Sequence, residues 1–345
     1  MNLAFQQDYP LQGLNSFGFS AVAERFIVLE TLEQVRALHE ELQRRPQPLL
    51  WLGGGSNLVL APRVEGIVAH IGLRGREVEP LDGSDQVRVT LTAGENWHAS
   101  VEWLLAEGVF GLENLALIPG SVGAAPVQNI GAYGVEIGDR LEAVEVFDWR
   151  NGQLRWLNHE QCAFGYRDSC FKREPGRYLI TRVRLLLSRT PAPRVSYAPL
   201  RQRLSPEQAA DPRAVFEAVC QIRRSKLPDP AQTGNAGSFF KNPVVDSACY
   251  QRLLRRFPDL VAYPVAEGYK LAAGWLIDRL GWKGYRCNGV GVHAHQALVL
   301  VNHGGGDQAR IAALARHIQQ SVREAFGVEL EVEPNFYPPL YPGAD

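Results

Sequence analysis

Closely spaced cysteines and long apolar runs are both missing from this 345-residue sequence. Its five cysteines form no Cys-x-x-Cys pair, and an odd number at scattered positions predicts reduced thiols in a cytoplasmic protein. No apolar run approaches the roughly 20 residues that span a bilayer. Residues 1–10 are too polar for the apolar core of a signal peptide. We therefore expect a cytoplasmic protein with no membrane partner.

An excess of charge of either sign is also missing. The sequence holds 36 Lys and Arg against 37 Asp and Glu, which gives a formal net charge of −1. Nucleic-acid binding depends on a basic excess that neutralises phosphates, so the composition argues against that class of protein. Hydrophobic residues make up 46% of the chain, and its length predicts two or three domains. The glycines and prolines show no repeat but cluster in a few loops, where we expect the function to lie.

The first of these loops is a glycine triplet. Residues 49–52 are typical of a short buried strand, and Gly53-Gly54-Gly55-Ser56-Asn57 leads from it into a second apolar run, residues 58–60. Successive backbone N–H groups with no side chain between them can converge on an anion, so this pattern indicates a phosphate cradle. It is neither a Rossmann fingerprint nor a P-loop, because no helix is predicted after it and no Gly-Lys-Ser/Thr follows. A wide turn between two strands is the alternative.

The second loop, residues 118–134, is long and has no charged side chain. It contains four glycines and three alanines. Loops of this length are uncommon in a compact domain unless they carry function, and an uncharged one is suited to wrap a large, partly apolar ligand through its backbone amides. A dinucleotide with an aromatic ring system fits that description, and buried turn packing is the alternative.

Periodicity and caps predict a mixed α+β fold. Strands are expected at residues 21–29, 86–92, 296–301 and 328–336. Helices are expected at residues 31–45, 96–107, 211–226, 247–257, 270–280 and 307–326, with Thr31 and Gln34 forming a capping box at the start of the first. In the last strand, alternation places Glu329, Glu331 and Glu333 on one face, which is usually a solvated edge.

Residues 234–243 read Gly-Asn-Ala-Gly-Ser-Phe-Phe-Lys-Asn-Pro and set a hydroxyl, Ser238, between a glycine turn and two aromatic residues. Gly237 permits a positive φ or the close approach of a flat ligand. Ser238 would then be a small O–H group that can donate a proton into a closed site. A glycine turn that enters a buried strand is the alternative.

Charged and metal-binding candidates are fewer. Arg167 carries a rigid fork suited to a carboxylate, and an ordinary ion pair with Asp168 is the alternative. The basic end of the helix at residues 211–226 either faces the helix carbonyls or contacts a diphosphate. His293 and His295 would share one face of a strand, but two histidines alone make a weak metal site, so we predict no metal.

Taken together, these motifs resemble a known family. Residues 52–60 and 118–134 are similar to the two FAD-binding stretches of the p-cresol methylhydroxylase type of flavin domain. With residues 165–169, 226–230 and 234–243, the chain resembles the UDP-N-acetylenolpyruvoylglucosamine reductase family over nearly its whole length. The resemblance implies an α+β fold with a two-part FAD-binding domain and a C-terminal α+β substrate-binding domain. The implied limits are residues 1–75 and 76–226 for the two FAD-binding subdomains and 227–327 for the substrate-binding domain, with 328–345 returning near the site.

The resemblance also implies a reaction. A flavoprotein oxidoreductase of peptidoglycan synthesis, and so of cell wall biogenesis, cell shape and cell division, is expected. NADPH would reduce FAD and leave. The UDP-N-acetylglucosamine enolpyruvate would take a hydride from flavin N5 at C3 and a proton from Ser238 at C2. Arg167 would hold the enolpyruvyl carboxylate, and Glu333 would polarise the enol. Here Pro334 follows this glutamate, whereas the family's Leu-Glu-Pro-Glu-Val type of run has proline before it, so Glu331 is the second choice.

Further contacts follow from the resemblance alone. Contacts to FAD are implied at Gly53, Gly54, Gly55, Ser56, Asn57, Leu58, Ile118, Pro119, Gly120, Ser121, Gly123, Gly131, Ile180 and Arg223. Contacts to the substrate or to NADPH are implied at Tyr133, Tyr197, Lys226, Asn242, Lys283 and Gln296, with Tyr197 on a loop that crosses the substrate in one branch of the family. A monomer is expected. The alternatives are another FAD-dependent oxidase of the same superfamily, which would react readily with oxygen, and a non-catalytic FAD-binding module.

Overall fold

The computed structural model describes residues 3–339, and the chain forms two compact units that interleave in sequence. Unit 1 comprises the chain up to Tyr9 with Ala23–Gly54 and Glu65–Arg224. Unit 2 comprises Pro10–Val22, Gly55–Val64 and the chain from Ser225 onward. Each unit has its own cluster of buried hydrophobic residues. The three-part division expected from the sequence stays a prediction, and residues 340–345 of the returning segment lie outside the described residues.

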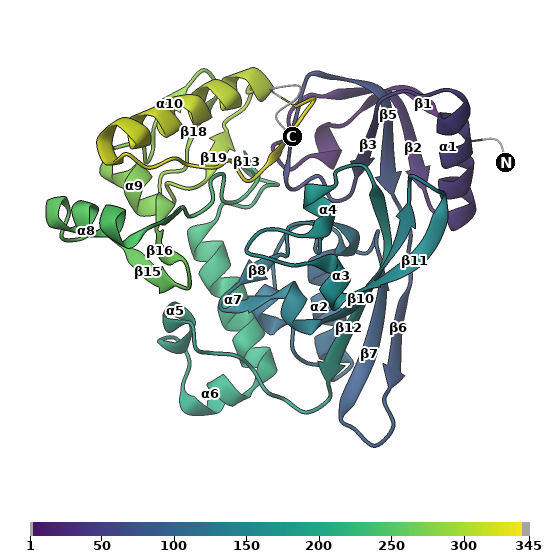
Figure 1. Ribbon diagram of the computed structural model, residues 1–345, viewed down its shortest axis with the longest axis horizontal. Helices are drawn as coiled ribbons and strands as arrows, with labels where there is room; N and C mark the ends of the chain where they lie inside the picture. Colours follow the sequence, from purple (N-terminus) through teal and green to yellow (C-terminus); the bar gives the residue numbers. More distant parts are fainter. Residues whose placement is uncertain (1–2, 340–345) are drawn as a thin grey trace. The chain divides into compact units, whose positions relative to one another are not determined.

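A four-stranded sheet begins unit 1, in the order β1-β2-β5-β3 (Figure 1). Its strands are β1 (Gln6–Pro10), β2 (Val22–Leu29), β5 (Arg63–Ile71) and β3 (Leu49–Leu52), and β3 runs parallel to β5. Helix α1 (Leu32–Arg44) starts at the predicted capping box of Thr31 and Gln34 and buries one apolar stripe, Val35, Leu38 and Leu42. The caps and the 3.6-residue period therefore placed this helix correctly.

The second sheet of unit 1 has five antiparallel strands in the order β11-β10-β12-β7-β6. They are β11 (Gln153–Asn158), β10 (Leu141–Asp148), β12 (Tyr178–Ser188), β7 (Gln86–Thr92) and β6 (Arg76–Pro80). Helix α2 (Trp97–Ala106) starts at Asn96, as predicted, and α7 (Pro212–Lys226) starts at a proline. Shorter elements complete the unit: β8 (Gly131–Ala132), β9 (Val135–Glu136), α3 (His159–Cys162), α4 (Cys170–Arg173), α5 (Ala198–Arg201) and α6 (Pro206–Ala210).

Unit 2 contains three small sheets. One has the order β13-β19-β18-β17, from β13 (Gly234–Asn235), β19 (Leu300–Asn302), β18 (Val290–Val292) and β17 (Arg286–Cys287). Another has the order β14-β16-β15, from β14 (Val244–Val245), β16 (Gly268–Leu271) and β15 (Ala262–Val265). The third pairs β20 (Asn335–Tyr337) in parallel with β4 (Leu58–Leu60). Its helices are α8 (Ser247–Arg256), α9 (Ala273–Arg279) and α10 (Gln308–Phe326), the last capped by Asp307 and by Gly327 in the left-handed region (Figure 1).

Three expected elements of unit 2 are wrong in part. The expected helix at 270–280 is split, because Lys270 and Leu271 pair with β14 and β15 and only then does α9 begin. The expected strand at 296–301 is confined to β19, and residues 296–299 form a turn and its flanks, while His293 and His295 lie in a bend rather than on a strand. The expected strand at 328–336 is reduced to one bridge at Val332 and the short β20, because its backbone partners come from two different segments.

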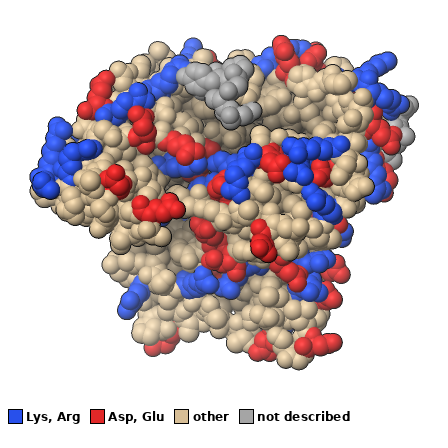
Figure 2. Space-filling view, viewed as in Figure 1, with Lys and Arg blue, Asp and Glu red and all other residues tan. Residues whose placement is uncertain are grey.

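The distribution of charged side chains and the state of the cysteines can be compared with the composition. On the face shown in Figure 2, basic and acidic side chains are interspersed, in line with the formal net charge of −1. All five cysteines are free thiols. None of the helices within residues 3–339 combines the length and the apolar character needed to cross a bilayer.

Candidate functional site

The start of the first predicted cofactor loop lies against the second loop in unit 1. A Cβ on Gly54 would come within 2.6 Å of the Cα of Gly120, and a Cβ on Gly53 within 2.6 Å of Ser121 Oγ. Backbone atoms cannot move aside as the end of a side chain can, so Gly54 in particular has no substitute. Without a side chain at Gly54, the two loops pack backbone against backbone, and their N–H groups can face a phosphate with no side chain between them. The residues present therefore fit a dinucleotide cradle.

The second of these loops is fixed to the end of β7 and the start of α2. Gly123 donates its N–H to the Ala93 carbonyl at 2.8 Å, and a Cβ on Gly123 would lie 2.5 Å from that of Ala93. The Ala93 N–H in turn donates to the carbonyl of Thr181 at 2.9 Å, next to the predicted contact Ile180 in β12. Trp97, the first residue of α2, donates its N–H to the Gly120 carbonyl at 3.0 Å.

The same loop begins at a strained residue that two side chains hold. Leu117 has a φ of +57°. Its N–H donates to Nδ1 of His98 at 3.1 Å, and its carbonyl accepts from Nε of Arg223 at 3.1 Å. Burial lowers the pKa of both His98 and Arg223, and the first shift favours the neutral imidazole that this bond requires. Arg223 was predicted as a cofactor contact, whereas His98 was missed because only the fold brings it to Leu117.

Arg167 lies on a two-residue turn between Gly165 and Asp168, which exchange two backbone hydrogen bonds. It has a φ of +54°, and its Nη2 donates to the Gly131 carbonyl at 2.7 Å. Asp168 forms its ion pair with Arg173. The alternative of an Arg167–Asp168 pair is therefore wrong, and the guanidinium lies instead on the glycine-rich loop.

Asn129 joins that loop to the turn of Arg167. It is 2% exposed, and its Nδ2 donates to Glu136 Oε2 at 2.6 Å and to the Gly165 carbonyl at 3.0 Å. Its Oδ1 accepts from the N–H of Gly138 at 3.0 Å. Asn129 was not among the predicted site residues, although an amide in a loop of otherwise small and apolar residues is a signal that the sequence carries.

Two predicted substrate contacts meet in unit 1. The rings of Tyr133 and Tyr197 have centroids 5.5 Å apart and planes at 86° to each other. Burial raises the pKa of Tyr133, so its phenol is neutral and can donate. Lys226, at the end of α7, is exposed and belongs to unit 2.

In unit 2, Ser238 lies between a glycine turn and a buried aromatic anchor. Gly237 has a φ of +70° and open space where its Cβ would be, so the predicted positive φ is confirmed. Phe239 and Phe240 are 0% and 1% exposed, and Ser238 itself is exposed. Gly234 is required because a Cβ there would lie 2.0 Å from the Phe17 carbonyl oxygen. The glycine turn does enter a buried segment, and it also presents the hydroxyl.

The same segment of unit 2 is paired with Glu333. The N–H of Glu333 donates to the Phe239 carbonyl at 2.9 Å. Asn57, two residues after the glycine triplet, donates from Nδ2 to the Glu333 carbonyl at 3.4 Å. Glu331 is exposed and forms an ion pair with Lys241. Both candidate glutamates lie beside residues 234–243, because the Glu331 carbonyl accepts from the N–H of Lys241, but only Glu333 is half-buried.

The remaining predicted contacts of unit 2 lie around α9. Asn242 Oδ1 accepts from the N–H of Ala273, the first residue of α9, at 3.0 Å. Gln296 Oε1 would lie 3.5 Å from a Cβ on Gly274. Lys283 follows the helix and pairs with Asp278 at 2.5 Å. The structure thus brings Asn242 and Gln296 to the start of one helix and places Lys283 beyond its other end.

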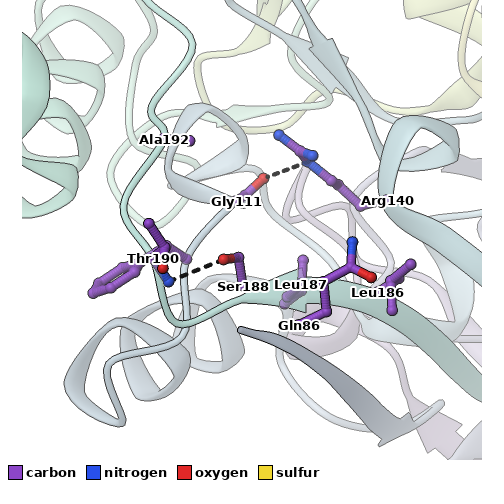
Figure 3. Close-up of a pocket in the computed structure, with 9 residues that line it drawn as sticks. Gln86, Gly111, Arg140, Leu186, Leu187, Ser188, Thr190 and Ala192 are labelled. Carbon is purple, nitrogen blue, oxygen red and sulfur yellow. Dashed lines mark hydrogen bonds between the residues drawn. The ribbon is translucent and has the colours of Figure 1, made fainter. Parts of the chain in front are cut away.

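A small pocket of about 70 Å³ in unit 1 is a separate feature (Figure 3). Arg140 closes one side of it by donating from Nε to the Gly111 carbonyl at 3.3 Å. Its lining contains none of the predicted site residues: Gln86, Phe110, Gly111, Arg140, Leu186, Leu187, Ser188, Thr190 and Ala192.

Comparison with known proteins identifies the fold and the family. A model of an FAD binding domain matches residues 23–158, and a model of the UDP-N-acetylenolpyruvoylglucosamine reductase C-terminal domain matches residues 229–337. Over 340 residues the chain is 52% identical to the UDP-N-acetylenolpyruvoylglucosamine reductase of Pseudomonas aeruginosa, covering 98% of this chain and 100% of the relative. The chain belongs to the UDP-N-acetylenolpyruvoylglucosamine reductase family. The enzyme of that name from Pseudomonas putida is 51% identical over the same shares of both chains.

A solved structure agrees with this family. The crystal structure of UDP-N-acetylenolpyruvylglucosamine reductase from Thermus caldophilus matches with a TM-score of 0.67 at 25% identity, over 97% of this chain and 99% of that one. The predicted reductase family, the fold class and the use of FAD are therefore confirmed. The roles of the individual site residues stay predictions.

Proposed function

We propose that this protein catalyses the NADPH-dependent reduction of UDP-N-acetylglucosamine enolpyruvate to UDP-N-acetylmuramate in peptidoglycan synthesis. The full-length similarity to reductases of this name supports the reaction. The observation that carries the assignment of residues is the backbone bond from Glu333 to Phe239, next to Ser238. It brings the backbone of a half-buried glutamate beside the segment that presents an accessible hydroxyl, and protonation of a developing carbanion needs such a proton donor.

FAD, when bound, takes up hydride from NADPH and supplies it at N5 to C3 of the enolpyruvyl group. On the protein side, Gly53, Gly54, Gly120 and Ser121 would hold its phosphates through backbone N–H groups, because these turns pack against each other without side chains between them. Apart from Ile180 and Arg223, the other predicted contacts lie in these two loops or next to them in the sequence, and Arg223 supports Leu117 at the start of the second.

Ser238 is the proposed proton donor to C2. Addition of hydride at C3 moves the electron pair of the double bond to C2, where the carboxylate delocalises it as an enolate. The bond that forms is C2–H, and the Oγ–H bond of Ser238 breaks. Serine is a weak acid, but an enolate is strongly basic and a closed site limits competing water. The exposed position of Ser238 allows water to return the proton afterwards.

Arg167 and Glu333 are proposed to stabilise the charge on the substrate. The guanidinium fork of Arg167 suits the enolpyruvyl carboxylate, and its bond to the Gly131 carbonyl fixes its direction. An ionised carboxylate facing an enolate would be repelled. Glu333 therefore acts either as a neutral acid or through Arg167. Glu333 is half-buried whereas Glu331 is exposed, which supports this choice of residue.

The finer parts of the proposal follow the resemblance. Contacts to the UDP-sugar or to NADPH are assigned to Tyr133, Tyr197, Lys226, Asn242, Lys283 and Gln296. The FAD-binding part is assigned to residues 1–75 and 76–226 and the substrate-binding part to 227–327. A monomeric, cytoplasmic protein without nucleic-acid or membrane partners completes the proposal.

Ser238→Ala tests the reaction in two separate halves. The variant should keep its FAD and still be reduced by NADPH under anaerobic conditions. Reoxidation of the reduced flavin by the enolpyruvyl sugar should then slow by about a thousandfold or more, because protonation at C2 lacks its donor. Stopped-flow absorbance of the flavin measures both halves.

Four outcomes of this experiment would contradict the proposal. Near-normal reoxidation in the variant would show that the serine only packs. A colourless wild type would exclude a bound flavin, and a wild type that NADPH does not bleach would indicate a non-catalytic module. Fast reoxidation of the wild type by oxygen, with no response to the sugar, would indicate an oxidase of the same superfamily.

A further inference from the structure

We infer that Asn114 is a positioning residue that holds two tyrosine-bearing segments of unit 1 together. It is 1% exposed, and its Nδ2 donates to the Tyr133 carbonyl at 2.9 Å and to the Arg194 carbonyl at 2.7 Å. A carbonyl oxygen can only accept, so these two partners fix which end of the amide carries the nitrogen. One buried side chain thus joins two segments that are far apart in the sequence.

The segment that carries Tyr197 needs such support. Residues 191–196 belong to no helix or strand, so tertiary contacts set their path. On the surface, Arg194 donates to Asp139 Oδ2 at 2.8 Å, but an exposed ion pair of this kind adds little stability. The side-chain amide of Asn114 is buried. A buried hydrogen bond is stronger than an exposed one, and a buried polar group left without a partner is costly.

The other segment is strained where Asn114 holds it. Tyr133 has a φ of +51°, which a residue with a Cβ adopts only when its surroundings compensate. Its ring then meets the ring of Tyr197 edge to face. Both tyrosines are proposed substrate contacts, so this inference rests on the proposed function and deepens it. Asn114 sets the geometry of the pair without touching the substrate.

Asn114→Asp tests whether Asn114 holds the two segments together (the clamp), and this test does not depend on enzyme turnover. The substitution keeps the shape of the side chain but replaces its NH₂ group by an oxygen that, when ionised, cannot donate. Two facing carbonyl oxygens and burial raise the pKa of the introduced carboxyl, so protonation at lower pH restores one donor. Trypsin digestion of the FAD-loaded protein should cut between Arg189 and Arg203 about tenfold faster than in wild type at about pH 8. This ratio should fall toward one at about pH 6.

Equal cutting of variant and wild type over this pH range, at unchanged Tm, would overturn the inference. Asn114→Ser, which keeps a single donor, replaces the first variant should that variant not fold, and about threefold faster cutting is then expected. Leu115→Ala is the matched control, because Leu115 is the buried neighbour of Asn114. It should lower Tm without directing cleavage to this segment.

Steady-state kinetics show whether the clamp acts through the tyrosines. With the enolpyruvyl UDP-sugar, Asn114→Ser should raise KM about tenfold and keep kcat within about threefold of wild type, because binding contacts are disturbed and the proton donor is not. In a Tyr197→Ala background the same substitution should add little, since both changes act on one unit. A fall in kcat at unchanged KM would overturn this role.

The two proposals can fail separately. If the wild type does not reduce this sugar, the proposed function is wrong, but the cleavage ratio still decides whether Asn114 holds the two segments together.

Discussion

At the scale of single residues, the neutral imidazole of His98 supports the start of the second cofactor loop, residues 118–134. His98 accepts the N–H of Leu117, and a protonated Nδ1 would have no lone pair for this bond. Burial lowers the pKa of His98, so the folded protein binds this proton less readily than the unfolded chain. The stability that follows is fully present above the ordinary value of 6.5 and is lost as the pH falls through the folded-state pKa.

His98→Asn should flatten this pH dependence. The Oδ1 of asparagine can accept the Leu117 N–H at any pH, so the variant should lack the loss of about 1 kcal/mol that wild type shows as the pH is lowered from about 7 to about 5. Thermal melts of the FAD-loaded proteins measure the difference. The other histidines with lowered pKa values, His70, His293 and His303, titrate in both proteins and cancel. Parallel Tm curves would show that His98 is not the group responsible.

At the scale of elements, the position of Arg167 depends on a turn and a loop rather than on a helix or strand. The turn between Gly165 and Asp168 is closed by its own backbone bonds, and Asn129 ties it to the glycine-rich loop. Ser169, which caps α4, also donates from Oγ to the Val127 carbonyl at 2.6 Å. Because several buried bonds converge here, the direction of the guanidinium depends on the loop as a whole.

Asn129→Ala should separate this loop from the turn. The Glu136 carboxylate, the Gly138 N–H and the Gly165 carbonyl would each lose a partner, which should lower the free energy of unfolding by about 2 kcal/mol. We expect kcat to fall about a hundredfold with FAD retained, because Arg167 loses its support.

Asn158→Ala is the control for this experiment. Asn158 caps α3 in the same unit, and its loss should cost about 1 kcal/mol and leave kcat unchanged. Equal loss of kcat in both variants would mean that instability, rather than the position of Arg167, explains the effect.

At the scale of the whole molecule, each of the two units is compact in itself but is built from segments that are separate in the sequence. The core of unit 2 includes Phe17, Phe19 and Val59, which come from segments far before Ser225. The turn before Ser238 depends on the segment that contains Phe17. Gly234 packs against the Phe17 carbonyl, and Asn235 donates its N–H to the carbonyl of Ser16. A C-terminal fragment would therefore lack part of its own core.

A fragment of residues 225–345 should not fold alone. Removal of each of the two buried phenylalanines, Phe17 and Phe19, costs about 3–5 kcal/mol, and together they approach the roughly 5–15 kcal/mol that stabilises a typical domain. The expected result is poor dispersion of amide NMR signals and no cooperative melt, with the full chain as the control. A well-dispersed spectrum with a sharp melt would show that unit 2 is independent.

The sequence by itself determined those features that arise within a few residues. The capping box at Thr31, the cap or proline at the start of the other helices and the apolar stripes placed α1, α2, α7 and α10, and glycines marked the turns at Gly54 and Gly237. Each of these signals acts within one turn of chain, where backbone dihedral preferences and side-chain spacing dominate. The pattern of motifs was also sufficient to indicate the FAD-binding fold and the reductase family.

Only the tertiary structure decided which distant groups meet. The predicted helix at 270–280 became a strand and a shorter helix because β14 and β15 supplied partners for Lys270 and Leu271. The bonds of His98, Asn114 and Asn129 join distant segments, and Glu333 pairs with Phe239 across most of unit 2. In an unfolded chain water satisfies all these polar groups equally well, so their partners are fixed only once packing of the apolar residues has excluded it.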